Sequence, residues 1–116
     1  MKMKKDDNCL VNRTCIPCQG GMPALTHAEA EKYLLELGNS WDLNDKGHVY
    51  KVYRFANFMD AMTFANQVAE IAEKEGHHPD LKISWGSCEI EIWTHKVGGL
   101  TESDFILAAK IENLHV

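Results

Sequence analysis

The stretch LKISWGSCEIEIWTH, residues 81–95, decides the fold. Apolar and polar residues alternate on both sides of Gly86-Ser87, which is the pattern of a β-hairpin whose two-residue turn has glycine first. With that turn the apolar pairs share one face of the hairpin: Trp85 with Cys88, Ile83 with Ile90, and Leu81 with Ile92. On the other face Lys82 meets Glu91, a pair of opposite charge. A shift by one residue would place lysine opposite isoleucine, so we predict this register.

Extending the same ladder towards its open end brings histidines together. His78 lies opposite His95 in this register, and His77 is next to it in the chain. Pro79 has no backbone N–H, so the ladder loses a hydrogen bond there. We therefore expect His77, His78 and His95 at one end of the hairpin.

The flanking sequence predicts three helices and two further strands. Helix caps are expected at Thr26, Asn57 and Thr101, and the first two helices end at Gly38 and Gly76. Residues 41–43 and 48–55 are the added strands. This order predicts an α+β fold, a four-stranded antiparallel sheet with three helices packed on one face. We expect residues 1–25 to be an N-terminal arm and residues 26–116 to be the domain.

Composition narrows the classes of function. The chain has 116 residues, 45% of them hydrophobic and 25% charged, as expected for one globular domain. A net charge of −5 lacks the basic excess of nucleic-acid binders. No apolar run reaches the ~20 residues of a membrane helix, and the basic start, residues 1–7, has no apolar stretch like that of a signal peptide. We expect a cytoplasmic protein that binds neither nucleic acid nor membrane and forms a homo-oligomer through its open sheet face and strand edges.

The three histidines carry the chemistry of the predicted site. Imidazole titrates near neutral pH, so a cluster of them can donate and accept protons. Two other interpretations stay open, a metal site and a polar surface. Against the metal, neighbouring residues of an extended chain point to opposite faces. Asp104 joins this site only if the loop 97–100 returns tightly and brings the helix start beside His95. In the first turn of a helix an acidic residue otherwise only interacts favourably with the helix dipole.

Two other features have simpler interpretations. Cys15-Ile16-Pro17-Cys18 is a C-x-x-C motif, for which Cys9 and His27 are the nearest further zinc ligands, and we interpret it as part of a structural or incidental arm. The tryptophans, Trp41, Trp85 and Trp93, are expected to be packing residues, although Trp93 shares the polar face with His95 and could stack on a flat ligand.

Several motifs together resemble a known family. They are Glu73-Lys74-x-x-His77-His78-Pro79-Asp80, then Trp85, then Thr94-His95, then Gly99-Leu100-Thr101-x-x-Asp104, preceded by Trp41 and Phe55-x-x-Phe58. They resemble the signature of the pterin-4a-carbinolamine dehydratases over residues 25–116. The arm, with its C-x-P-C-x-G-G-x-P-x-L run, is similar to that of some bacterial members. Leu81 departs from many animal members, which have an aromatic residue at that position, so the resemblance does not define the exact wall of the pocket.

The resemblance implies a lyase that dehydrates 4a-hydroxytetrahydrobiopterin to quinonoid dihydrobiopterin in tetrahydrobiopterin recycling. It implies no metal, no bound cofactor, and a homodimer or homotetramer.

The resemblance also implies roles for individual residues. His77 and His95 would be the acid/base pair, and His78 would orient or bind the pterin. Asp104 would orient a histidine, and the supporting residues would be Glu73, Pro79, Trp93 and Thr94. Two alternatives remain, a non-catalytic dimeric binding or regulatory module of the same fold and a metal-dependent enzyme.

Overall fold

The structure is a computed structural model that describes residues 10–13, 15, 23–38 and 40–115. Its elements in chain order are the 3-10 helix η1 (Leu10–Asn12), α1 (His27–Leu37), β1 (Asp42–Leu43), β2 (Val49–Arg54), α2 (Phe58–Glu75), β3 (Asp80–Ser84), β4 (Ser87–Ile92), the 3-10 helix η2 (His95–Val97) and α3 (Glu102–His115).

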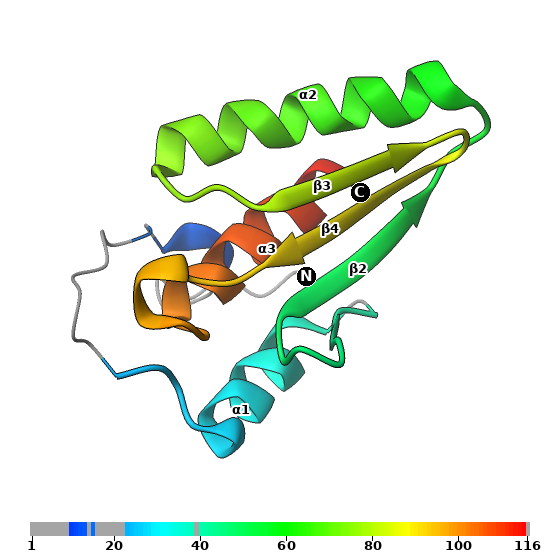
Figure 1. The fold of residues 1–116 in the computed structure, drawn as a ribbon. Coiled ribbons are helices and arrows are strands. Elements are labelled where there is room, and N and C mark those ends of the chain that lie inside the picture. Colours follow the sequence, from blue (N-terminus) through cyan, green and yellow to red (C-terminus); the bar gives the residue numbers. More distant parts are fainter. Residues whose placement is uncertain (1–9, 14, 16–22, 39, 116) are drawn as a thin grey trace, which may run out of the picture.

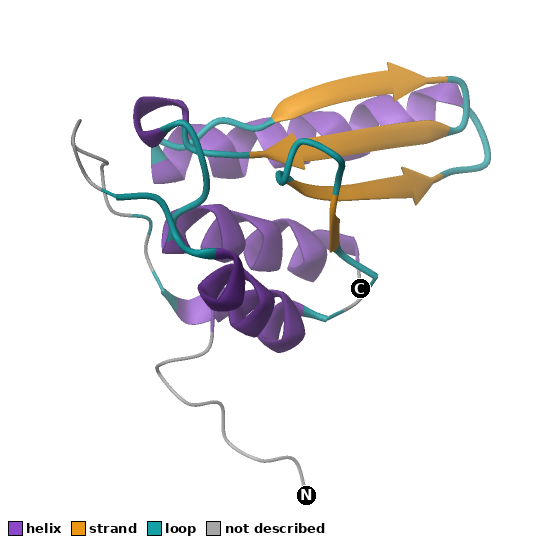
Figure 2. Ribbon diagram, turned by 60° about the horizontal axis from the view of Figure 1, so that its bottom comes forward, coloured by secondary structure: helices purple, strands orange, loops and turns teal. Residues whose placement is uncertain are grey.

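The four strands form one antiparallel sheet in the order β1-β2-β4-β3. Helix α2 runs along β3 and β4, and α3 packs on both α2 and β2, so these two helices share a face of the sheet (Figure 1). Helix α1 packs against α3, as Figure 2 shows from a second direction. The predicted α+β architecture is confirmed. None of the helices in the described ranges is long and apolar enough to span a membrane.

The predicted helix ends are where the local signals placed them. Thr26 and Glu29 form a capping box at the start of α1, and Gly38 follows its last residue. The Asn57 side chain caps α2, and Gly76 ends that helix in the left-handed conformation with φ +67°. These ends depend on neighbours in the sequence, which is why the sequence predicts them well.

The predicted register of the hairpin is wrong by two residues. The observed pairs are Ser84 with Ser87, Ile83 with Cys88, Lys82 with Glu89, Leu81 with Ile90, and Asp80 with Glu91. The turn is centred on Trp85-Gly86, with Gly86 second and at φ +78°, as a type II turn requires. A shift by two keeps the side chains of both strands on their predicted faces and moves only Trp85 into the turn, so alternation alone could not separate the two registers.

The end of β2 explains why glycine occupies that place. The Phe55 N–H donates to the Gly86 carbonyl at 2.8 Å, and a Cβ on Gly86 would lie 3.2 Å from the Phe55 carbonyl oxygen. Trp85 therefore sits in the turn, 74% exposed, and its predicted packing role is wrong. Trp41 is buried as predicted, and its indole donates to Glu112 on α3 at 3.1 Å.

The chain beyond β4 returns tightly, as its two glycines predict. The Thr94 N–H donates to the Gly99 carbonyl at 2.8 Å, and Gly98 between them has φ +66°. A Cβ on Gly99 would lie 2.8 Å from the Ala24 Cβ, so only glycine fits there. This return places the first turn of α3 beside the end of β4.

The core lies between the sheet and the helices. Its fully buried members come mainly from β2, β4 and α3: Val49, Tyr53, Ile90, Ile92, Phe105, Ile106, Leu107 and Ile111. Burial of side chains of this size stabilises by about 1.5–3 kcal/mol each, so packing holds the site's elements in place.

Candidate active site

His77 and Asp104 form the centre of the site. The His77 Nε2 lies 2.6 Å from the Asp104 Oδ1. His77 directly follows Gly76, where α2 ends, and Asp104 is the third residue of α3. The imidazole is 12% exposed and the Asp104 side chain is 0% exposed. An ionised carboxylate only accepts hydrogen bonds, so this contact places a proton on Nε2 of His77.

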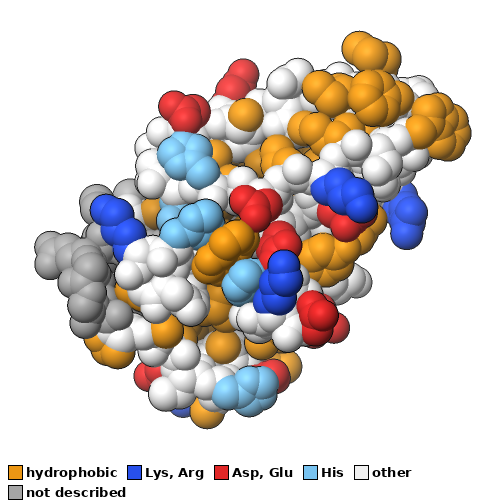
Figure 3. All heavy atoms as spheres, viewed as in Figure 1, with side chains coloured by type: hydrophobic (Ala, Val, Ile, Leu, Met, Phe, Trp, Pro, Cys, Tyr) orange, Lys and Arg blue, Asp and Glu red, His pale blue; other side chains and the backbone are white. Residues whose placement is uncertain are grey.

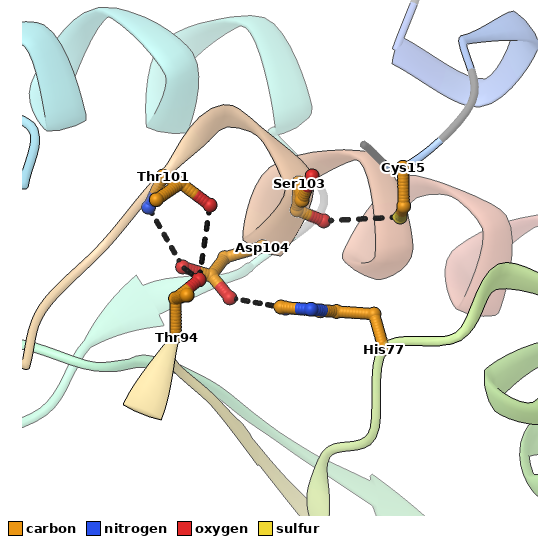
Figure 4. A network of polar contacts seen from close by, with 6 residues as sticks. All are labelled: Cys15, His77, Thr94, Thr101, Ser103 and Asp104. Atoms are coloured by element: carbon orange, nitrogen blue, oxygen red, sulfur yellow. Dashed lines mark hydrogen bonds and ion pairs between the residues drawn. The ribbon is translucent and has the colours of Figure 1, made fainter. Parts of the chain in front are cut away.

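The Asp104 carboxylate has two further donors on its second oxygen. The Thr101 N–H donates at 2.8 Å and the Thr94 hydroxyl donates at 2.9 Å, both to Oδ2 (Figure 4). The two threonine hydroxyls lie 2.9 Å apart. Three donors hold a buried anion in one orientation.

His78 lies at the surface beside the end of α2. Its Nε2 is 2.7 Å from the Glu73 Oε2, and the two side chains are 60% and 78% exposed. Solvent screens such a pair, so the contact orients His78 more than it stabilises the fold. Pro79 is partly buried between His78 and β3.

His95 belongs to a stack of three rings. It stacks on Trp93 with ring centroids 4.1 Å apart, and the other stacked partner of Trp93 is His48 at 4.2 Å. Glu91 Oε2 lies 2.5 Å from Nδ1 of His48. Hydrogen bonds from His48 and from Asn44 hold the pKa of the Glu91 carboxyl below its usual value.

The predicted site residues thus fall into three contacting groups: His77 with Asp104 and Thr94, His78 with Glu73, and His95 with Trp93. The prediction that His78 faces His95 across the ladder is wrong, because the ladder ends at Asp80 and Glu91. The loop does bring the start of α3 to the site, but Asp104 contacts His77 there. Figure 3 shows histidine side chains gathered on the face near the start of α3, with hydrophobic and acidic side chains between them.

Sequence reasoning missed His48. Its place follows from the pairing of β2 with β4, in which Val49 is opposite Ile92, so the next step outward sets His48 beside Trp93. The two residues are 45 positions apart, and no local pattern links them. A predicted β2–β4 pairing would have found it.

The C-x-x-C motif is only partly within the described residues. Cys15 is buried, while Cys9 and Cys18 lie outside the described residues. Burial, reinforced by the nearby Glu75 carboxylate, raises the pKa of the Cys15 thiol to about 12. Among the described residues no group of three or more His, Cys, Asp or Glu side chains could hold a metal ion.

Comparison with known proteins decides the family. The sequence model of the family described as "Pterin 4 alpha carbinolamine dehydratase" matches residues 23–114. The chain belongs to this family. The match contains all the residues of the three contacting groups, and the predicted class of enzyme, a hydro-lyase, follows from it.

Relatives in the family match over nearly the whole chain. A Rickettsia canadensis protein named "Putative pterin-4-alpha-carbinolamine dehydratase" is 60% identical over 104 residues, which cover 90% of this chain and 95% of the relative. A Methylococcus capsulatus protein with the same name is 51% identical over 110 residues, 93% of this chain and 96% of the relative.

Solved structures share the fold. A transcriptional coactivator/pterin dehydratase from Brucella melitensis has a TM-score of 0.73 at 29% identity, covering 78% of this chain and 97% of that chain. A pterin dehydratase-like protein identified as a RuBisCO assembly factor in the alpha-carboxysome has a TM-score of 0.55 at 19% identity, covering 67% of this chain and 92% of that chain. The second likeness is one of fold alone.

Proposed function

We propose that this chain dehydrates 4a-hydroxytetrahydrobiopterin to quinonoid dihydrobiopterin and water, in tetrahydrobiopterin recycling, by histidine general acid/base catalysis. The observation that carries the proposal is the contact between His77 and the buried Asp104 in a member of this family. The proposal assigns the chemistry to side chains and uses neither a metal nor a bound cofactor.

The reaction needs two proton transfers. The C4a–O bond breaks and the hydroxyl leaves as water after it takes up a proton, while N5 loses its proton and its electron pair forms the new C=N bond. Because Asp104 holds the Nε2 proton of His77, the neutral ring has its lone pair on Nδ1, where it can accept the N5 proton. Asp104 then stabilises the imidazolium that forms. His95, which is exposed, is proposed as the acid that protonates the leaving hydroxyl.

The remaining residues bind or support. His78, oriented by Glu73, is proposed to bind the pterin. The Trp93 ring stacks on the imidazole rings of both His48 and His95, so we assign Trp93 to hold His95 in place rather than to stack on the substrate. Thr94 fixes the Asp104 carboxylate, and Pro79 keeps the backbone of His78 extended.

Rapid mixing tests this proposal. The substrate is generated freshly, and its dehydration is followed by stopped-flow absorbance with and without protein, with the spontaneous rate subtracted. His77→Ala and His95→Ala should each lower kcat by about 10²-fold or more, as loss of a general acid or base does. His78→Ala should raise KM more than it lowers kcat, as loss of a uniform binding contact does.

A matched control is His27→Ala, because His27 on α1 is 81% exposed and its ion pair is with Glu31 on the same helix. This variant should keep the wild-type rate. If the wild-type protein does not raise the rate above the spontaneous one, the proposed dehydratase activity is refuted and the non-catalytic module is favoured. Full kcat in both the His77 and His95 variants would refute the histidine mechanism.

We also propose a homodimer or homotetramer. Strand β3 ends the sheet, and no further strand pairs with it in the part of the chain that the structure describes. Exposed apolar side chains, Phe58, Met59 and Trp85, gather beyond it, over the start of α2 and the β3–β4 turn (Figure 3). Edges and apolar patches of this kind favour association with another copy. Light scattering that shows only a 13.1 kDa species at micromolar concentration would contradict this.

The proposed location is the cytoplasm. Cys15 and Cys88 are both free thiols, as is usual in a reducing compartment. Fractionation of the source cells with an antibody against the chain would test this, and recovery from an oxidising compartment would contradict it.

A further inference from the structure

The N-terminal segment, which lies outside the residues matched by the family model, packs against the helix ends that carry the site. Residues 10–13 and 15 precede residues 23–114, which the family model matches. Leu10 is 4% exposed and Cys15 is 7% exposed, and both belong to the hydrophobic core. A segment predicted to be an arm is therefore partly built into the fold.

Cys15 bridges the end of α2, which precedes His77, and the start of α3, which carries Asp104. Its N–H donates to the Glu75 Oε1 at 3.0 Å, and its thiol donates to the Ser103 carbonyl at 3.5 Å. Glu75 is the last residue of α2, two positions before His77, and Ser103 immediately precedes Asp104. Figure 4 shows the Cys15–Ser103 contact beside the His77–Asp104 pair.

Three further contacts fasten the segment to α3 and its neighbours. The Arg13 guanidinium lies 2.6 Å from Glu102, the first residue of α3, and 3.5 Å from Glu36 on α1. Lys110 on α3 donates to the Val11 carbonyl at 2.9 Å. The same ammonium lies 3.7 Å from Glu75, whose side chain is only 8% exposed.

We propose that residues 10–13 and 15 form an N-terminal brace that positions His77 against Asp104 by tying the end of α2 to the start of α3. This inference rests on the proposed function. A charge-assisted hydrogen bond at 2.6 Å weakens with small displacements of either partner, and misplacement of catalytic groups by about 1 Å is enough to slow a reaction. The buried thiol stays protonated and serves as a hydrogen-bond donor, so Cys15 is not a nucleophile in this arrangement.

Full-length variants of Glu75 and Leu10 test the brace. Glu75→Ala removes the acceptor for the Cys15 N–H, whereas Glu75→Gln keeps an acceptor there. Leu10→Ala loosens the segment at a buried core residue that belongs to none of the three contacting groups. Glu70→Ala is the matched control, because Glu70 is an exposed glutamate on the same helix. Alanine is the best helix former, so a loss in Glu75→Ala cannot come from helix propensity.

Two readouts separate positioning from stability, both taken well below the unfolding temperature of each variant. Glu75→Ala and Leu10→Ala should lower kcat about fivefold, the effect of about one lost hydrogen bond, with KM changed less than twofold. In ¹⁵N-histidine NMR the Nε2 signals of His77 should shift towards those of a free imidazole. Glu75→Gln should restore most of both, and Glu70→Ala should match the wild type.

The outcomes decide between the two proposals. Folded Glu75→Ala and Leu10→Ala proteins with wild-type kcat and wild-type His77 signals would overturn the brace, even if they unfold at a lower temperature. If the wild-type chain fails to accelerate dehydration, the proposed function fails, and the His77 signals alone then support or overturn the brace.

Discussion

Replacing Asp104 with asparagine removes the negative charge 2.6 Å from His77 Nε2 and keeps nearly the same side-chain shape. The Thr101 N–H and the Thr94 hydroxyl both donate to Oδ2, so the asparagine carbonyl must face them. Its NH₂ group then faces His77 and can only donate. Nε2 of His77 must therefore accept, and the proton of the neutral ring moves to Nδ1. The substitution reverses the tautomer that the proposed base requires.

The expected magnitude follows from the contacts that change. One hydrogen bond to a charged group is worth about 1.5–3 kcal/mol, so Asp104→Asn should lower kcat by about 10- to 100-fold. That is milder than the loss expected for His77→Ala, which removes the base itself. Stability should fall by a similar free energy. Asp104→Ala should cost more, about 3–5 kcal/mol, because it leaves three donors without their acceptor at a site that is 0% exposed.

Three measurements check this reasoning. Urea unfolding gives the free energies, stopped-flow absorbance gives kcat, and long-range ¹H–¹⁵N correlation on histidine-labelled protein gives the tautomer of His77. An Asp104→Asn protein with wild-type kcat and the proton still on Nε2 would refute the role assigned to Asp104.

Three other predictions follow from the structure. In the folded protein at pH 8 the Cys15 thiol, with a pKa of about 12, should resist iodoacetamide for hours and react only on unfolding, as peptide mass mapping would show; fast labelling of Cys15 in the native state would contradict the buried contact. The pKa of Glu91 is lowered in the folded state, so its bond with His48 stabilises the folded protein above the ordinary pKa of 4.5, and this stabilisation is lost as the pH falls through the folded pKa. Glu91→Gln should lower the free energy of unfolding by about 1 kcal/mol at pH 7 and make its decline in acid less steep. Equal acid sensitivity of the wild type and the variant in urea titrations would count against this. Trp85→Glu should shift the oligomer towards the monomer in light scattering without lowering kcat per chain at saturating substrate, and an unchanged mass would remove Trp85 from the interface.

How much of the site could be predicted depended on the range of each contact. The motif residues around His77, His78, His95 and Asp104 carried the family and were visible in the sequence. Their actual partners were not, because the His77–Asp104 contact joins residues 27 positions apart. That contact exists only because α2 and α3 pack against each other and the loop 97–100 returns tightly.

The sequence by itself determined the helix ends, the strand faces and the family. Caps such as Thr26 and Asn57 act through hydrogen bonds to backbone N–H groups three residues away, and strand faces follow from alternation with a period of two. Only the tertiary structure decided the hairpin register. The backbone of Gly86 contacts Phe55 at the end of another strand, and a shift by two leaves the alternation intact. The same holds for the stack of His48 on Trp93 and for the Cys15 bridge. These contacts join distant segments, so they are set by the packing of whole elements, which local sequence patterns do not report.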